Sequence, residues 1–232
     1  MRPCRYPKGL KPPSMKETIL AAAVFCAVQA GAQQNAVYQN RFQKFDLAKE
    51  YYQKGQYSLA YPLMRELKQD LREADRTNNA LQAEEINYYA TVLALKQNNA
   101  SAAYDARQFI DVAENGARVS MMNFHLAEYL FRQGQYSDAV ALYEGADISN
   151  LDNREIADLK FHQGYSYFTL QQFAQAKPLL NAIRQLPKDP NYVDANYYYG
   201  FIAFRDRNYT EALQAFKTVE NEPQYESLVP YY

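Results

Sequence analysis

The feature of this sequence that most constrains its fold is a pattern that recurs five times. The pattern is a small residue, an aromatic residue or Leu three positions later, a turn, an aromatic residue, and Ala twelve positions after the start. The second copy is weaker, with Asn99 in place of the aromatic residue after the turn, and the fifth has Ala203 three positions after its start. The small residues that start the copies, here termed anchors, are Ala48, Ala90, Ala127, Gly164 and Gly200. Their spacing of roughly 37 residues predicts a stack of repeated supersecondary units.

Each copy is typical of two helices joined by a turn. Only 8 Gly and 10 Pro interrupt 232 residues, which favours long helices over many short strands. Gly55 and Gly134 lie where a first helix should end, and glycine accepts the left-handed conformation that closes a helix. We expect the second helices to be capped at their N-termini by Ser58, Ser137 and Thr210. We expect them to end before prolines such as Pro187 and Pro223.

The pattern resembles the tetratricopeptide repeat (TPR), a helix–turn–helix unit of about 34 residues. The resemblance covers residues 41–232, although the chain has no Trp and its spacers are longer than usual. It implies an all-α fold, a right-handed α-α superhelix (solenoid) of about five helical hairpins. Because the next anchor would follow Tyr232, we expect the last repeat to be incomplete and the chain to be the N-terminal part of a longer array.

Residues 1–32 have the order of a secretory signal peptide. Basic residues precede an apolar run at 19–28, and Ala30, Gly31 and Ala32 follow it. The run is about half of the ~20 residues that a membrane-spanning helix needs. We therefore predict an exported, periplasmic or outer-membrane-associated protein, cut after Ala32, with Met15 as a possible true start. The mature part would have no membrane span.

Aromatic residues recur at fixed offsets from the anchors. If the first helices line the concave side, as the resemblance implies, these rings form a groove for partner segments. The predicted groove residues are Phe45, Tyr52, Phe124, Phe131, Phe161, Tyr165, Phe168, Tyr197, Phe201 and Phe204. The second copy departs from the pattern, with Asn87 and Ala94. The alternative is that the rings pack between repeats as core. Four charged residues are expected near the same face, where they could contact polar groups of a ligand: Lys49, Glu128, Arg132 and Arg205.

Motifs for catalysis, metals or cofactors are not evident. His125 and His162 are 37 positions apart and each lies two residues before its anchor, so repetition explains them without a metal. Both cysteines, Cys4 and Cys26, fall in the expected signal peptide, so the mature chain would have no thiol. Residues after 32 carry 20 basic and 25 acidic side chains without a basic cluster. We expect no catalytic site, metal, cofactor or nucleic-acid partner.

The sequence therefore predicts a non-enzymatic scaffold for protein or peptide segments of the bacterial cell envelope. One alternative is the sensor or regulatory N-terminal half of a longer receptor or enzyme. Another is glycan binding, because aromatic rings also stack on sugars. Fold alone does not choose among these partners.

Overall fold

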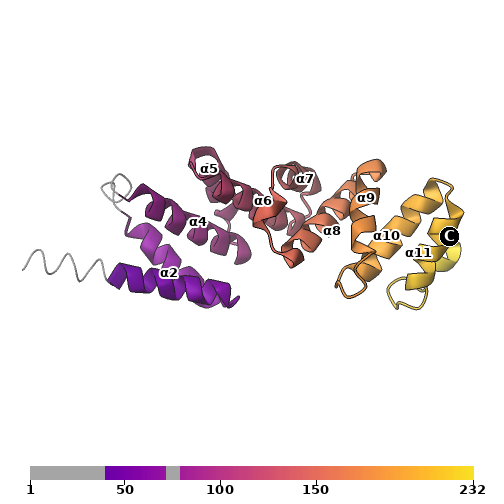
Figure 1. Ribbon diagram of the computed structural model, residues 1–232, viewed down its shortest axis with the longest axis horizontal. Coiled ribbons are helices and arrows are strands. Elements are labelled where there is room, and N and C mark those ends of the chain that lie inside the picture. The colour runs from indigo at the N-terminus through magenta and orange to yellow at the C-terminus, as the bar shows by residue number, and fades with distance from the viewer. Residues whose placement is uncertain (1–39, 72–78) are drawn as a thin grey trace, which may run out of the picture.

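A computed structural model describes residues 40–71 and 79–232 of this protein. The expected signal peptide and the segment 72–78 lie outside the described residues. The described chain is all-α, as predicted, and forms five helical hairpins in sequence order (Figure 1). The hairpins are helix 40–53 with α2 (Tyr57–Gln69), α4 (Ala80–Lys96) with α5 (Ala102–Val112), α6 (Gly116–Arg132) with α7 (Tyr136–Glu144), α8 (Asn153–Thr169) with α9 (Phe173–Ile183), and α10 (Tyr192–Arg205) with α11 (Tyr209–Val219). Short 3-10 helices lie at Ile148–Asn150 and Val229–Tyr231.

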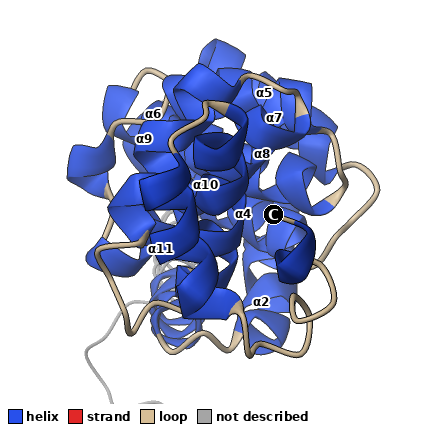
Figure 2. Cartoon of the chain, turned by 90° about the vertical axis from the view of Figure 1, so that its right-hand side faces the viewer, coloured by secondary structure: helices blue, strands red, loops and turns tan. Residues whose placement is uncertain are grey.

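The hairpins stack into an elongated solenoid. Each second helix packs against its own first helix and against the first helix of the next hairpin, as α7 does with α6 and α8. Successive first helices such as α4, α6 and α8 also contact one another. Viewed from the end of the array formed by α10 and α11, the described residues are helices and loops without any strand (Figure 2). The core is therefore continuous from hairpin to hairpin and has no single centre.

Small residues allow close approach within each hairpin, as predicted. The anchors are buried in every copy, and so is the Ala on the second helix. The buried second-helix residues are Ala60, Ala102, Ala139, Ala176 and Ala212. A Cβ atom at Gly200 would lie only 2.8 Å from Cε1 of Phe216, so this contact has no room for a methyl group.

Replacing Gly200 with Ala is expected to lower the free energy of unfolding by about 2 kcal/mol, because the added methyl overpacks the α10–α11 contact. Chemical denaturation measures the effect. Gly116→Ala is the matched control, since a Cβ there meets nothing within 4 Å. Equal stability of the two variants would show that Phe216 moves aside at no cost.

Each first helix ends in the same closing motif. A residue with positive φ follows the helix, and the next amide donates to the carbonyl five residues earlier. In the first copy Gly55 has φ of 70°, and the amide of Gln56 donates to the carbonyl of Tyr51 at 2.8 Å. The positive-φ residues are Gly55, Asn98, Gly134, Gln171 and Arg207. The glycines therefore close helices as predicted, whereas three copies hold a side chain in this strained region.

This motif corrects the register of the second copy. The bond from the amide of Asn99 to the carbonyl of Ala94 aligns Asn99 with Gln56. The anchor equivalent to Ala48 is then Thr91, one residue after Ala90. The ring position is occupied by buried Tyr88, not by Asn87. The aromatic pattern at this position therefore also holds in the second copy, and the turn before Ala102 is longer.

Replacing Gln171 with Gly is expected to raise the free energy of unfolding by about 1 kcal/mol, because glycine adopts a φ of 59° without a steric penalty. Gln171→Ala removes the same polar group but keeps the strain, and should bring no gain. Thermal and urea unfolding measure the stability of both variants against that of the unchanged chain. A stabilised Ala variant would mean that the side chain, not the backbone, limits stability.

The three second helices with predicted caps begin two residues earlier than those caps require. They start at the aromatic residue, as at Tyr57 and Tyr136, so Ser58 and Ser137 lie inside the first turn. In the last hairpin Asn208, and not Thr210, accepts the capping hydrogen bond from the amide of Glu211. Pro187 and Pro223 do follow the ends of α9 and α11, each by four residues. The second helices have 9 to 13 residues, so the long spacers fall in first helices of up to 17 residues and in the connections.

Candidate functional site

The ten predicted groove residues divide into two groups. Phe45, Phe124 and Phe161 are only 4–6% exposed and belong to the core. They lie three positions before their anchors, on the side of the first helix that meets the neighbouring helices. These three rings have almost no surface left for a ligand. The other seven are half-buried, namely Tyr52, Phe131, Tyr165, Phe168, Tyr197, Phe201 and Phe204.

Most of the half-buried rings join a chain of ring contacts that crosses repeats 3 to 5. This chain, here termed the aromatic ladder, consists of Phe131, Tyr165, Tyr198, Phe168, Phe201, Tyr232 and Phe204. Ring centroids of successive members are 4.8 to 5.8 Å apart, with interplanar angles of 53° to 80°. Such edge-to-face contacts are favourable beyond simple area burial. The ladder joins repeats and still leaves part of each ring in contact with solvent.

Sequence reasoning missed Tyr198 and Tyr232 as members of the ladder. The aromatic residues that begin α7 and α9 also pack against the ladder. Phe131 contacts Tyr136 at 5.8 Å, and Phe168 contacts Phe173 at 5.5 Å. These second-helix rings were visible in the repeat pattern, but their approach to the first-helix rings follows from the tight turn between the helices.

The ladder does not continue into the second repeat. Leu95 is aligned with Phe131 and is almost fully buried. Tyr52 contacts Tyr89 at 5.1 Å, and both belong to a separate group of rings at the N-terminal end of the array. The candidate site is therefore strongest on α6, α8 and α10.

A polar cluster lies beside the ladder between repeats 3 and 4. Glu128 accepts a hydrogen bond from the hydroxyl of Tyr143 at 2.6 Å, and its Oε1 is 2.8 Å from Nδ1 of His162. The His162 ring stacks on Phe131, with centroids 4.1 Å apart. Burial works to raise the pKa of Glu128, but the bond and charge of His162 together with the Tyr143 hydroxyl outweigh it and leave the pKa lowered.

The equivalent histidine one repeat earlier has no such partner. The residue aligned with Glu128 is Val92, which is fully buried, and Nε2 of His125 has no hydrogen-bond partner. Burial first, and then the positive charges of Lys96 and Arg132, lower the pKa of His125 to about 3. His125 is therefore a neutral core residue, and nothing around it resembles a ligand set.

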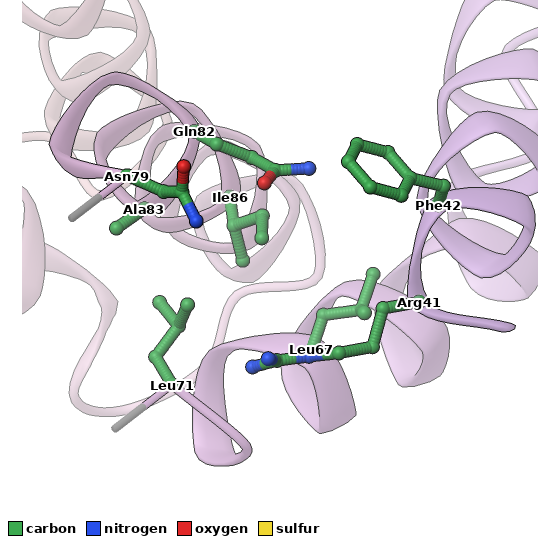
Figure 3. A pocket seen from close by; sticks show the side chains of 8 residues that line it. All are labelled: Arg41, Phe42, Leu67, Leu71, Asn79, Gln82, Ala83 and Ile86. Carbon is green, nitrogen blue, oxygen red and sulfur yellow. The ribbon is translucent and has the colours of Figure 1, made fainter. Parts of the chain in front are cut away.

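The described residues offer no enclosed site for a small molecule. A pocket of about 20 Å³, room for about one water, lies between helix 40–53, the end of α2 and the start of α4 (Figure 3). Leu67, Ala83 and Ile86 form its apolar wall, and Arg41 donates to the carbonyl of Asp70 at its rim. A larger hollow of about 450 Å³ between α2, α4 and α5 adjoins the segment 72–78, so we assign no site to it.

The part of the chain that the structure describes holds no group of three or more His, Cys, Asp or Glu side chains able to bind a metal ion. None of the helices in this part is long and apolar enough to cross a membrane.

Comparison with known proteins agrees with the repeat pattern. The tetratricopeptide repeat family profile matches residues 90–153 and 161–226, together more than half of the chain. A search of curated proteins found no match. Among solved structures, a variant of MamA is similar with a TM-score of 0.59 at 18% identity, over 78% of this chain and 96% of that one.

Other MamA structures agree with this result. The MamA MSR-1 structure has a TM-score of 0.57 at 18% identity, over 81% of this chain and 98% of that chain. MamA from Desulfovibrio magneticus has a TM-score of 0.54 at 15% identity, over 77% of this chain and 92% of that one. At such identities the likeness shows the fold alone.

Proposed function

Because this chain belongs to the tetratricopeptide repeat family, we propose that it is a non-enzymatic scaffold that binds segments of cell-envelope proteins along the aromatic ladder. The family supports a role in protein interaction. The observation that carries the proposal is the run of half-buried rings from Phe131 to Phe201 on the first helices, which Tyr232 extends to Phe204. Rings that are partly exposed offer apolar area without a large loss of side-chain entropy on binding.

Contact geometry favours polypeptide over sugar as the ligand. A sugar stacks on the open face of an aromatic ring, whereas the ladder rings meet edge to face, at 73° between Tyr165 and Tyr198 and 76° between Phe168 and Phe201. In each such pair the edge of one ring covers a face of the other. What remains is a ridged apolar strip with hydroxyl groups, which suits an extended chain or an apolar helix.

Site-specific photocrosslinking in intact cells tests the binding role. A photoreactive phenylalanine at Phe168 is expected to capture a small number of envelope proteins, identified by mass spectrometry. Tyr104 on α5 is the control position, because it is 66% exposed yet lies away from the ladder. Equal yields at the two positions would mean that capture reflects exposure and not a binding site.

Export is a separate part of the proposal and rests on the order of basic, apolar and small residues in 1–32. N-terminal sequencing of the mature protein should begin at residue 33, and cell fractionation should find it outside the cytoplasm. An intact N-terminus in a cytoplasmic fraction would contradict the envelope location and leave the scaffold role standing.

A further inference from the structure

Three cations occupy the same repeat position, five residues after the anchor. They are Lys96, Arg132 and Arg205, in the last turns of α4, α6 and α10. The equivalent residues in the first and fourth repeats are Gln53 and Thr169. Because the offset is constant, the three cations lie along one edge of the solenoid, beside the turns that join first and second helices. We term this row the cationic edge.

Each of these cations is held by a neutral partner from the preceding repeat. The Lys96 ammonium lies 4.8 Å from the ring centroid of Tyr57, and the Arg205 guanidinium lies 4.1 Å from that of Phe173. Arg132 donates to the backbone carbonyl of Leu95 at 3.2 Å, which places it beside Lys96. Ring faces and carbonyls orient a cation without neutralising it. Glu128, one turn before Arg132 on α6, balances part of the Arg132 charge, since Arg132 contributes to the lowered pKa of Glu128.

Elsewhere in the described chain, several lysine and arginine side chains form ion pairs with acidic side chains. Lys49 lies 2.8 Å from Glu85, Arg118 lies 3.0 Å from Glu84, and Lys177 lies 3.2 Å from Asp206. The protein as a whole carries a formal net charge of −1. Positive charge on the cationic edge is therefore a local feature and not a consequence of composition.

Two independent effects determine the sign of the net charge along the cationic edge. The C-terminus of each first helix contributes about half a negative charge, which cancels only part of one cation. Lys96 and Arg132 both help to lower the pKa of His125, so their positive field extends into the neighbouring repeat. A net positive strip therefore adjoins the aromatic ladder.

We infer that the cationic edge binds an extended, acidic segment of a partner protein whose carboxylates are spaced three residues apart. This inference rests on the proposed scaffold function and specifies the chemistry of its ligand. Neighbouring packed helices have axes roughly 8–10 Å apart. An extended chain in the polyproline II conformation rises about 3.1 Å per residue with three residues per turn, so side chains three or six residues apart lie on the same side of it. Acids at positions 1 and 4 would meet Lys96 and Arg132, and an acid at position 10 would meet Arg205, two repeats further on.

Fluorescence anisotropy with the full chain tests the spacing. The probe is a labelled 12-residue peptide of Ala and Ser with Glu at positions 1, 4 and 10. Its isomer has the three Glu residues at positions 1, 2 and 3. We expect at least tenfold tighter binding of the spaced peptide, weakening as salt is raised. Equal affinities for the isomers would overturn the inference, and so would equal binding of the spaced peptide with Gln in place of Glu.

The double variant Lys96→Gln/Arg132→Gln should bind the spaced peptide at least tenfold more weakly. The matched control is Lys188→Gln/Lys217→Gln, which removes two exposed cations outside the edge and should change affinity less than twofold. Circular dichroism of each variant verifies the fold. An unchanged affinity in the folded first variant would refute the inference, as would binding of sulfated glycan or anionic vesicles in place of the peptide.

The two proposals fail in different ways. If photocrosslinking from Phe168 captures the same proteins in the Lys96→Gln/Arg132→Gln variant as in the unchanged chain, the acidic-segment inference is wrong while the scaffold function holds. If the spaced peptide binds but Phe168 captures nothing above the Tyr104 control, the edge is a binding site and the ladder is not.

Discussion

Replacing Glu128 with Ala is expected to lower the free energy of unfolding by about 3 kcal/mol, because it leaves two buried polar partners without an acceptor. The carboxylate receives the Tyr143 hydroxyl and faces Nδ1 of His162, and its side chain is only 16% exposed. The three residues come from α6, α7 and α8, so the loss falls on the junction between repeats 3 and 4. Urea unfolding followed by circular dichroism gives the size of the effect.

Glu144→Ala is the matched control, because Glu144 also accepts a tyrosine hydroxyl, that of Tyr167, but lies exposed on the surface. Its loss should cost less than about 1 kcal/mol. The double variant Glu128→Leu/His162→Leu should be more stable than Glu128→Ala, since only the Tyr143 hydroxyl, and not His162 as well, is then left without an acceptor. If Glu128→Ala lowers the free energy of unfolding no more than Glu144→Ala does, water takes the place of the Glu128 carboxylate.

Acidification from pH 7 to pH 4.5 should cost this protein about 3 kcal/mol through His125 alone. The pKa of this buried imidazole is lowered to about 3, against 6.5 in the unfolded chain. The unfolded chain therefore takes up a proton below pH 6.5 while the folded chain does not. The contribution of His125 is complete above pH 6.5 and is lost progressively as the pH falls toward 3.

The variant His125→Phe isolates this effect, because it keeps a ring of similar size and removes the titrating group. Its stability should fall much less between pH 7 and pH 4.5 in urea titrations at several pH values. The lowered pKa of Glu128 acts in a different window, since its contribution is complete above about 4.5 and is lost below that pH. Parallel pH profiles for the variant and the unchanged chain would mean that His125 gains a proton in the folded state.

Much of the site follows from repetition, but the assignment of each ring does not. A helical pattern of period 3.6 shows that Phe161, Tyr165 and Phe168 share one side of α8. It does not show how far the next hairpin covers them. The structure buries Phe161 among the neighbouring helices and leaves Tyr165 and Phe168 half-exposed, because the offset between stacked hairpins decides which ring meets a neighbour.

In the second repeat, the sequence alone does not identify the anchor correctly. Its sequence alone favours Ala90 as the anchor, since alanine is the small residue of the pattern. Only the closing hydrogen bond from Asn99 to Ala94 identifies Thr91 as the structural equivalent. A shift of one residue rotates a helix by about 100°, so it changes which side chains face the core.

The sequence by itself determined the all-α class, the five hairpins and the small residues at their closest contacts, because these depend on spacing along one helix and one turn. Tertiary structure decided which partner each repeated residue receives. His125 and His162 hold the same place in adjacent repeats, yet Nε2 of His125 is buried without a partner while Nδ1 of His162 lies 2.8 Å from Glu128. That difference depends on the residue the preceding repeat presents across the junction, which becomes visible only when the hairpins are stacked.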